Sequence, residues 1–371
     1  MEYNTGLESI DNFNWYYKKL FTWNVKYYSK GNRIVYFGEK IDKPKFIVVL
    51  KKIKVDKNYD HILREIYFLT CCKKCKYFIT LVDIFLSEDE NYIFLILKDE
   101  GANLSELIDY SNSGKKNYDY TKIDNMIKWI IFQIICGLYI LHKNNLVHHD
   151  IKPGNILISS TGVVKIADFG SVDKSSIPGN GTLFYESPEG LINKNSTEKD
   201  DMWAVGVIMV ELFTKKYPFF NYKNFCNNNE IRILFQLKAI LSQYAININN
   251  EQIDINNNNV IYNILANIIK PKAYNQYNIL EKLINIDEIE DKEAVDLINN
   301  LLKINPEKRF NAEQALNSKY LSKYRQHFQD CRILYEEKDY ETLLNSSGNK
   351  NIFIRNVKTI KQKFFGEILF E

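Results

Sequence analysis

The chain has 371 residues, of which 45% are hydrophobic and 26% charged, so it is long enough for two ordinary domains or one larger two-lobed unit with a substantial core. Its 49 Lys and Arg residues nearly balance its 46 Asp and Glu residues, and the net charge of +3 argues against a dedicated nucleic-acid-binding protein. The apolar stretch from Met126 to Leu141 contains Lys128 and Gln133 and is short for a membrane span, so a membrane protein is not expected.

The N-terminal residues, Met-Glu-Tyr-Asn, lack the charged and then apolar pattern of a signal peptide, which predicts a cytosolic or nuclear protein. Cysteine usage agrees with this prediction. Cys72 and Cys75 have a spacing found in zinc sites, but no second close pair supplies the remaining ligands. Free thiols in a reducing compartment are the better interpretation.

The N-terminal third predicts a small sheet with one helix. Apolar and β-branched runs indicate strands, whereas Ile62, Ile66 and Leu69 have the spacing of one face of a helix. The expected elements are two strands within 23–36, a third at 46–51, a helix at 58–69, and two strands at 78–85 and 91–97. The prediction is therefore a five-stranded sheet with one helix.

The remainder of the chain predicts mainly helices. Residues 111–119 read as a loop, and Asp124 has the residue type and position of an N-cap for a long helix that ends near His142. Two Asn-rich stretches are too polar for a core and predict loops or disorder. Further segments are the Asn-rich 221–229 and 247–259, an amphipathic helix at 230–241, and a charged, helical tail at 324–371 that docks either on the rest of the chain or on a partner.

One short stretch concentrates chemistry. Within His148–Asn155, Asp150 can accept a proton, Lys152 can hold a phosphate, and Asn155 can bind a divalent metal. Asp168, thirteen residues after Asn155, supplies a second hard oxygen ligand of the type that Mg²⁺ prefers. The apolar segments between these two positions predict a β-hairpin with both ligands at its ends.

These two motifs at this spacing resemble the catalytic loop and the D-F-G motif of the eukaryotic serine/threonine protein kinase family. The resemblance covers about residues 23–323 and is weakly closer to the cyclin-dependent and MAP-kinase group. It implies an α+β fold with a β-rich N-lobe, a mainly helical C-lobe, and Mg·ATP bound between the two lobes. It also implies that Asp150, Lys152 and Asn155 are catalytic, and that Asn155 and Asp168 bind Mg²⁺.

The resemblance also implies a nucleotide site. Val48-Val49-Leu50-Lys51 matches the V-A-I-K motif, so Lys51 is expected to contact the ATP phosphates and Glu65 to pair with it. Residues 98–101 are the expected hinge. The residues implied at the ATP site are Gly31, Val35, Val49, Lys51, Glu65, Leu97 as the gatekeeper, Glu100, Leu157 and Asp168.

Three positions depart from the family pattern. Gly31 is the only glycine present where the family has a glycine-rich loop, and Val49 replaces the usual alanine, which narrows the adenine pocket. His149 replaces the arginine before the catalytic aspartate. Because a histidine is mostly neutral at pH 7 and offers no bidentate fork, we expect a kinase that activation-loop phosphorylation does not switch.

The segment after Asp168 matches the family through Gly181–Glu189. The resemblance implies that Thr182 hydrogen-bonds near Asp150 and Lys152, and that Glu189 forms an ion pair with Arg309. Asp201, in a D-x-W-x-x-G pattern, is expected to support the backbone of the catalytic loop. Lys152, two residues after Asp150, and Thr182 favour a serine/threonine substrate over tyrosine.

The sequence therefore predicts an ATP-dependent serine/threonine protein kinase with ATP and Mg²⁺ as cofactors, a protein substrate and a monomeric catalytic chain. Whether a cyclin-like regulatory subunit binds is left open. The expected division is an extension at 1–22, a kinase domain at 23–323 (N-lobe 23–97, hinge 98–101, C-lobe 102–323, with an Asn-rich insert at 221–262), and an extension at 324–371. The alternative is a pseudokinase that acts as a scaffold or allosteric regulator. A small-molecule kinase with the same fold is disfavoured by the complete peptide-positioning segment through Glu189.

Overall fold

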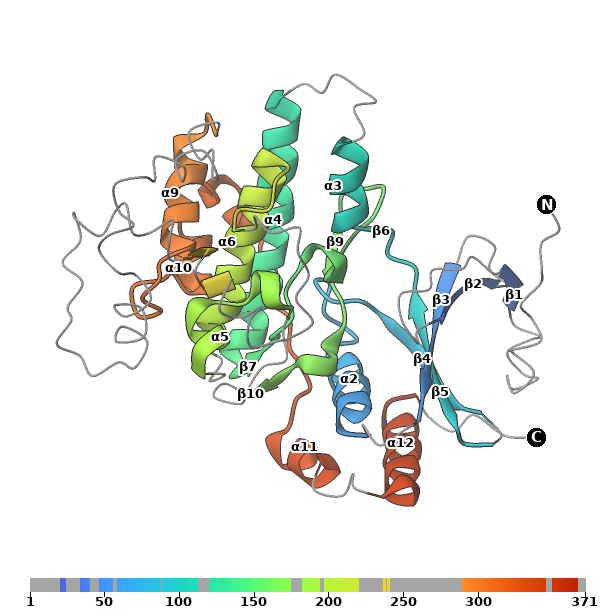
Figure 1. The fold of residues 1–371 in the computed structure, drawn as a ribbon. Coiled ribbons are helices and arrows are strands. Elements are labelled where there is room, and N and C mark those ends of the chain that lie inside the picture. The colour runs from blue at the N-terminus through green and yellow to red at the C-terminus, as the bar shows by residue number, and fades with distance from the viewer. Residues whose placement is uncertain are drawn as a thin grey trace. The chain divides into compact units, whose positions relative to one another are not determined.

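The computed structural model describes residues 21–24, 34–40, 47–55, 59–87, 89–112, 120–174, 182–193, 197–219, 236–237, 239–240, 289–344 and 349–365. Gly31 and both Asn-rich stretches lie outside these residues, as does most of the helix expected at 230–241. The chain divides into two compact units (Figure 1). Unit 1 comprises Met1–Gly101, Lys165–Val172 and Asp330–Glu371, and unit 2 comprises Ala102–Val164 and Asp173–Gln329.

Unit 1 contains a five-stranded antiparallel sheet with the order β1-β2-β3-β5-β4, which confirms the predicted sheet. Strand β3 shows why these residues form a strand: Val48 and Leu50 are fully buried, whereas Val49 and Lys51 alternate onto the other face. The elements are β1 Phe21–Asn24, β2 Ile34–Lys40, β3 Ile47–Lys54, α2 Tyr59–Cys71, β4 Leu81–Leu86 and β5 Tyr92–Lys98. Strand β4 begins later than expected, because Phe78 instead forms an isolated parallel bridge with Ile166.

The end of the chain also belongs to unit 1. It forms α11 (Glu337–Leu344) and α12 (Lys350–Phe365), so the expectation of a helical tail is confirmed. Figure 1 shows α12 beside α2, and both α11 and α12 pack against α2. Of the two destinations that the sequence left open for the tail, the structure shows docking on the chain itself.

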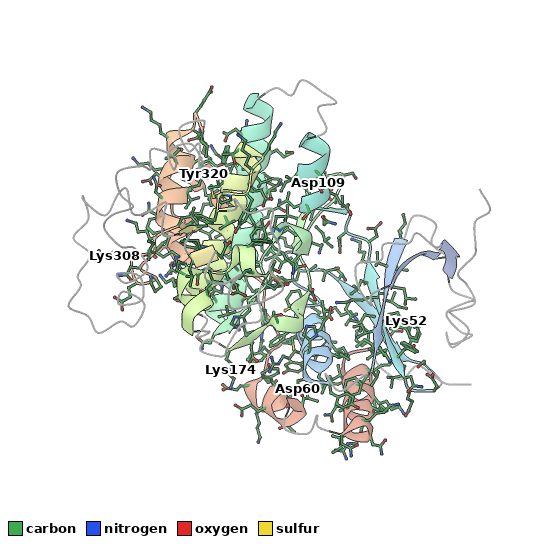
Figure 2. The ribbon with its side chains drawn as sticks, viewed as in Figure 1. Lys52, Asp60, Asp109, Lys174, Lys308 and Tyr320 are labelled. Carbon is green, nitrogen blue, oxygen red and sulfur yellow. The ribbon has the colours of Figure 1, made fainter. Side chains whose placement is uncertain are left out.

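Unit 2 is mainly helical and is built around α4 (Tyr120–Lys143), which packs against α6 (Glu198–Thr214) and α10 (Ala312–Leu316). Tyr320, labelled in Figure 2, is buried nearby with the Lys128 ammonium 4.4 Å from its ring centroid. The other helices are α3 Leu104–Asn112, α5 Pro188–Asn193 and α9 Lys292–Leu301. The short strands are β6 Ala102–Asn103, β7 Leu146–Val147, β8 Ile156–Ile158, β9 Val164–Ile166, which crosses the boundary between units, and β10 Asp173–Lys174.

The interior helices of unit 2 approach closely at a glycine. A Cβ at Gly206 of α6 would lie 2.7 Å from Leu302 Cδ2 and 3.0 Å from Leu301 Cβ, so a larger residue would push α9 away. Among the described residues, one helical stretch, Asp124–Lys143, is long and apolar enough to cross a membrane, and 67% of its most apolar window is buried inside the protein. Core helices of globular proteins pass the same test.

Two expectations for this region were wrong. Asp124 is not an N-cap, because α4 begins at Tyr120 and the Asp124 carboxylate lies 3.7 Å from the Lys128 ammonium one turn further on. Lys128 in turn contacts Asp291 at 3.1 Å, so a tertiary ion-pair network engages the carboxylate that was expected to cap the helix. The loop expected at 111–119 also starts too early, since residues 111–112 belong to α3.

Candidate active site

Unit 1 brings together Lys51, Glu65 and Asp168. Lys51 on β3 forms an ion pair with Glu65 on α2, and its Nζ also lies 3.4 Å from Asp168 Oδ1. The Glu65 side chain is 3% exposed and that of Lys51 12%, so water screens this pair far less than a surface pair. One ammonium therefore links a strand, a helix and the segment that carries Asp168.

The segment around Asp168 is fixed within unit 1 by its backbone and its neighbours. Ile166 N–H donates to Tyr77 O at 2.8 Å, and Ile79 N–H donates to Ile166 O at 2.9 Å. Phe169 is fully buried and packs edge-on against Phe78, with 5.3 Å between ring centroids. Asp168 itself has a left-handed backbone (φ 64°, ψ 74°), a conformation that Asp tolerates better than most residues.

Gly170 lets this segment approach helix α2. A Cβ at Gly170 would collide with the imidazole ring of His61, which lies on α2. Helix α2 and the D-F-G segment are thus linked at two places: His61 lies directly at Gly170, and Lys51 of β3 joins Glu65 to Asp168. A displacement of α2 would disturb both contacts.

Unit 2 holds a second polar cluster centred on Asp150. The Asp150 carboxylate accepts hydrogen bonds from Lys152 Nζ (2.5 Å), Asn155 Nδ2 (2.9 Å) and Thr182 Oγ1 (2.7 Å). Thr182 Oγ1 also accepts from Lys152 Nζ at 2.7 Å, and Asn155 Nδ2 also donates to Asp150 O at 2.8 Å. The structure therefore brings Lys152, Asn155 and Thr182 together around Asp150. Because Asn155 Nδ2 faces Asp150, Asn155 Oδ1 is the atom that can bind a metal ion.

Asp201 holds the backbone of the loop that carries Asp150. Its Oδ2 accepts from His148 N–H at 2.8 Å and its Oδ1 from His149 N–H at 3.0 Å, while His142 Nε2 lies 2.9 Å from Oδ2. Burial raises the pKa of Asp201, but the hydrogen bond and charge of His142 and the charges of His148 and His149 outweigh it and lower the pKa below 3.8. The carboxylate is thus ionised and fixed.

His149 adopts a left-handed backbone with φ 65° and is 8% exposed. At this turn of the backbone, the N–H group of His149 and that of the preceding His148 both point toward Asp201. The residue that replaces the family's arginine is therefore a buried imidazole in unit 2.

Glu189 and Arg309 form a buried ion pair, with Arg309 Nη1 2.5 Å from Glu189 Oε1 and Nη2 3.0 Å from Oε2. The Arg309 side chain is completely buried, and it donates further to Lys199 O and Lys303 O, both at 2.9 Å. Burial, and then the charge of Glu189, raise the pKa of nearby Asp200 to about 6. This network fixes the end of the segment that begins at Thr182.

The residues expected around the adenine are distributed as follows. Val49 and Leu97 are paired across β3 and β5, and Leu97 is 6% exposed. The Glu100 carboxylate points into unit 1, where it accepts from Thr80 Oγ1 at 3.0 Å and lies 3.5 Å from Lys165 Nζ. Leu157 lies on β8 of unit 2 opposite Asn103, and the backbone of Val35 is paired with that of Lys51.

Sequence reasoning missed Lys165, His61 and the aromatic residues of α2. Lys165 is buried and donates to Phe78 O at 3.0 Å, and burial lowers its pKa despite the nearby charge of Glu100. The only feature of the sequence that could have indicated a buried Lys165 is its position between Val164 and Ile166, which are themselves buried. Within the described ranges, no group of three or more His, Cys, Asp or Glu residues is arranged for a metal ion. Asn155 of unit 2 and Asp168 of unit 1 each offer one oxygen ligand of the type that Mg²⁺ prefers.

Comparison with known proteins gives consistent similarities. A model of the protein kinase domain matches residues 35–321. Cyclin-dependent kinase 8 of Drosophila melanogaster is 27% identical over 288 residues, which cover 71% of this chain and 62% of the relative. The sporulation-specific mitogen-activated protein kinase SMK1 of Saccharomyces cerevisiae is 28% identical over 338 residues (85% and 81%). The serine/threonine-protein kinase SSN3 of Candida albicans is 33% identical over 257 residues (65% and 41%).

Proposed function

This chain belongs to the eukaryotic serine/threonine protein kinase family, and we propose that it transfers the γ-phosphoryl group of Mg·ATP to a serine or threonine hydroxyl of a protein. The observation that carries the proposal is the cluster in which Lys152, Asn155 and Thr182 all donate to the Asp150 carboxylate. A carboxylate with this set of donors fits the family's acceptor-orienting aspartate, which takes the proton of the substrate hydroxyl.

The other polar residues receive roles from the same template. Lys51, held by Glu65, contacts the α- and β-phosphates, and Lys152 steadies the transferring phosphoryl group. Asp168 and Asn155 would each offer an oxygen ligand to Mg²⁺, which when bound would supply positive charge to the phosphate oxygens. Catalysis then rests on positioning and on electrostatic stabilisation of the transition state.

We assign Gly31, Val35, Val49, Leu97 and Leu157 to the surroundings of the adenine and phosphates. For Glu100 the assignment is narrower. Its carboxylate is engaged by Thr80 and lies near Lys165, so its backbone is the part suited to hold adenine. Leu97, with Val49 paired opposite, is the gatekeeper in this assignment.

Independence from activation-loop phosphorylation is part of the proposal. A buried, left-handed His149 cannot form the bidentate charge pair that an arginine forms with a phosphate. Lys152 and Thr182, which donate to the Asp150 carboxylate, are both residues of the chain itself. Treatment of the purified chain with a phosphatase should therefore leave its rate unchanged, and a large loss would refute this part.

The test measures phosphate transfer from labelled ATP with Mg²⁺ to a generic basic protein. Asp150→Asn should lower the rate by about 10²–10⁴-fold, the usual contribution of a positioned proton acceptor. Asp296→Asn, on the exposed face of α9 in the same unit, is the matched control and should retain the wild-type rate. Product analysis should find phosphoserine or phosphothreonine, and phosphotyrosine would contradict the substrate class.

The second candidate is a pseudokinase that acts as a scaffold or allosteric regulator. Val49 and His149 favour it, since both depart from the family pattern. If the wild type and Asp150→Asn both bind ATP but neither transfers phosphate, the result would support this candidate. A regulatory subunit, of the kind that the name of the cyclin-dependent relative suggests, would then be sought first. Location in the cytoplasm or the nucleus stays a prediction.

A further inference from the structure

Helix α2 is buried on two opposite faces. One face carries Glu65, which is 2% exposed and paired with Lys51. Since successive residues of a helix are about 100° apart, Tyr67 points to nearly the opposite side, and it too is only 2% exposed. A helix that is apolar on its outer face needs a cover to be stable in that position.

The described parts of the C-terminal segment, residues 330–344 and 349–365, supply this cover. Leu334 N–H donates to Cys71 O at 3.1 Å, so the segment is attached to the last residue of α2. The Tyr67 hydroxyl donates to Glu336 O at 3.0 Å and accepts from Glu336 N–H at 3.2 Å. These bonds fix the direction in which the segment enters α11.

An aromatic cluster forms the centre of the contact. The ring of Tyr340, in α11, lies 5.8 Å from that of Tyr67 and 5.3 Å from that of Phe68. Tyr335 stacks on Phe68 at 5.5 Å. Tyr340 is 2% exposed, so its ring is enclosed between the segment and α2. Ring pairs at these separations contribute beyond the area that they bury.

Helix α12 extends the cover toward the start of α2 and to β4. Phe353 is completely buried and its ring lies 5.1 Å from that of Tyr59, next to Asp60, which Figure 2 labels. Lys361 Nζ lies 3.6 Å from Asp83 Oδ1 on β4. The cover therefore runs along α2 from its first turn to its last residue.

We propose that the C-terminal segment is an intramolecular brace that holds α2 with Glu65 against Lys51, and that Tyr340 is a positioning residue for this ion pair. The proposal rests on the proposed function. It adds a structural reason why the ion pair of Lys51 and Glu65 stays in place. Through His61 and Gly170 the same helix supports the segment of Asp168, so loosening the brace affects two groups at once. A separate subunit cannot occupy this face of α2 while the segment is docked there.

The test is a comparison of Tyr340→Ala, Tyr340→Phe and Tyr324→Ala in the full chain. Tyr340→Ala should lower kcat by between about 10-fold and 100-fold, because displacement of a catalytic group by about 1 Å has a cost of this size. KM for the protein substrate should not change. Tyr340→Phe keeps the ring and should restore the wild-type kcat. Tyr324→Ala is the matched control, since Tyr324 packs on Trp129 and Phe132 of unit 2.

A double-mutant cycle separates positioning from a general loss of stability. In a Glu65→Gln background, Tyr340→Ala should lower kcat by a smaller factor than in the wild type, because only the effect through His61 and Gly170 remains. Equal losses of kcat in both backgrounds would overturn the proposal, as would a retained kcat in Tyr340→Ala. Where Tyr340→Ala does not fold, Phe353→Leu takes its place in the same cycle.

Hydrogen exchange provides a readout that does not depend on activity. In Tyr340→Ala, the amides of α2 should exchange faster, whereas those of β5 should remain unchanged. Unchanged exchange in α2 would overturn the proposal. Absence of phosphate transfer from the wild type would count against the proposed function, and hydrogen exchange would then decide whether the brace exists.

Discussion

The two polar clusters of this chain are supported in different ways. Around Asp150, the partners Lys152 and Asn155 come from the same loop, and Asp201 holds the backbone of that loop from within unit 2. The ion pair of Lys51 and Glu65 instead depends on the position of a whole helix, whose outer face is covered by residues about 270 positions later in the chain. The first cluster is fixed by hydrogen bonds made directly to Asp150 and its loop, and the second by packing on the far face of a helix, so the second is the more sensitive to changes outside the site.

Within the second cluster, the largest effect is expected from Asp168, which tests whether this cluster takes part in the reaction at all. Asp168→Ala should lower the rate of transfer by at least about 10²–10³-fold, as expected when one group that stabilises transition-state charge is lost. The fold should be retained, with a destabilisation on the order of 1 kcal/mol, because alanine tolerates the left-handed backbone less well.

Asp168→Asn serves as the matched variant. Asparagine accepts a left-handed backbone and removes only the charge, so it should lose activity without the loss of stability. The measurements are transfer from labelled ATP and thermal unfolding followed by circular dichroism. Retained turnover in either variant would remove Asp168 from the site.

Arg309 tests the internal support of unit 2. Arg309→Met leaves the Glu189 carboxylate buried without its partner, which should lower the free energy of unfolding by about 3–5 kcal/mol. Urea unfolding measures this difference. Adding Glu189→Leu removes the isolated charge and should recover part of the loss, and a single-variant loss below about 1 kcal/mol would show that the pair is not important for stability.

Asp201→Asn should affect the first cluster without removing any group that contacts substrate. An asparagine can accept one of the two N–H groups of His148 and His149, but its Nδ2 would face the other. We expect the rate to fall by about 10–100-fold through displacement of the loop, with KM for ATP nearly unchanged. A rate equal to that of the wild type would show that the loop does not need this support.

The same variant gives a pH dependence. The pKa of Asp201 is lower in the folded protein than its ordinary value of 3.8. The ionised carboxylate therefore contributes fully to stability above about pH 3.8, and this contribution is lost as the pH falls through the folded pKa. The difference in unfolding free energy between wild type and Asp201→Asn should therefore shrink as the pH falls below about 4. Urea unfolding at pH 7 and at pH 3 measures both values, and a difference that grows in acid would contradict the assignment.

Sequence reasoning succeeded where chemistry and spacing are local. Asp150, Lys152 and Asn155 lie within six residues, and the catalytic-loop pattern that contains them is specific. The α+β fold, with a strand-rich N-terminal region and a helical C-terminal region, also followed from that resemblance and from the apolar runs. Lys51 and Glu65 could be paired only through the family resemblance, in which the lysine at the end of a strand pairs with a glutamate of the following helix.

The failures share a physical cause, which is competition from distant residues. Asp124 has the residue type of a cap, but Lys128 engages its carboxylate and is itself held by Asp291, 163 positions later. Likewise, Phe353, Val357 and Ile360 have the spacing of an apolar helix face, which predicts an amphipathic helix but not the surface that it covers. No motif marks Tyr340 or Tyr67, because ring packing requires only volume and apolar surface.

The smallest effect is expected from a substitution at the edge of the brace. It tests whether charge or apolar burial attaches the C-terminal segment to α2. Lys358 and Glu90 are 3.1 Å apart, but their side chains are 65% and 40% exposed, and such pairs contribute less than about 1 kcal/mol. Lys358→Gln should therefore leave kcat and the exchange of α2 amides unchanged, in contrast to Phe353→Leu, which removes buried ring packing. Exchange measured at low and at high salt should also agree, because screening weakens surface ion pairs and not apolar contacts. Faster exchange in Lys358→Gln or at high salt would mean that charge, rather than the burial of Tyr340 and Phe353, attaches the segment to α2.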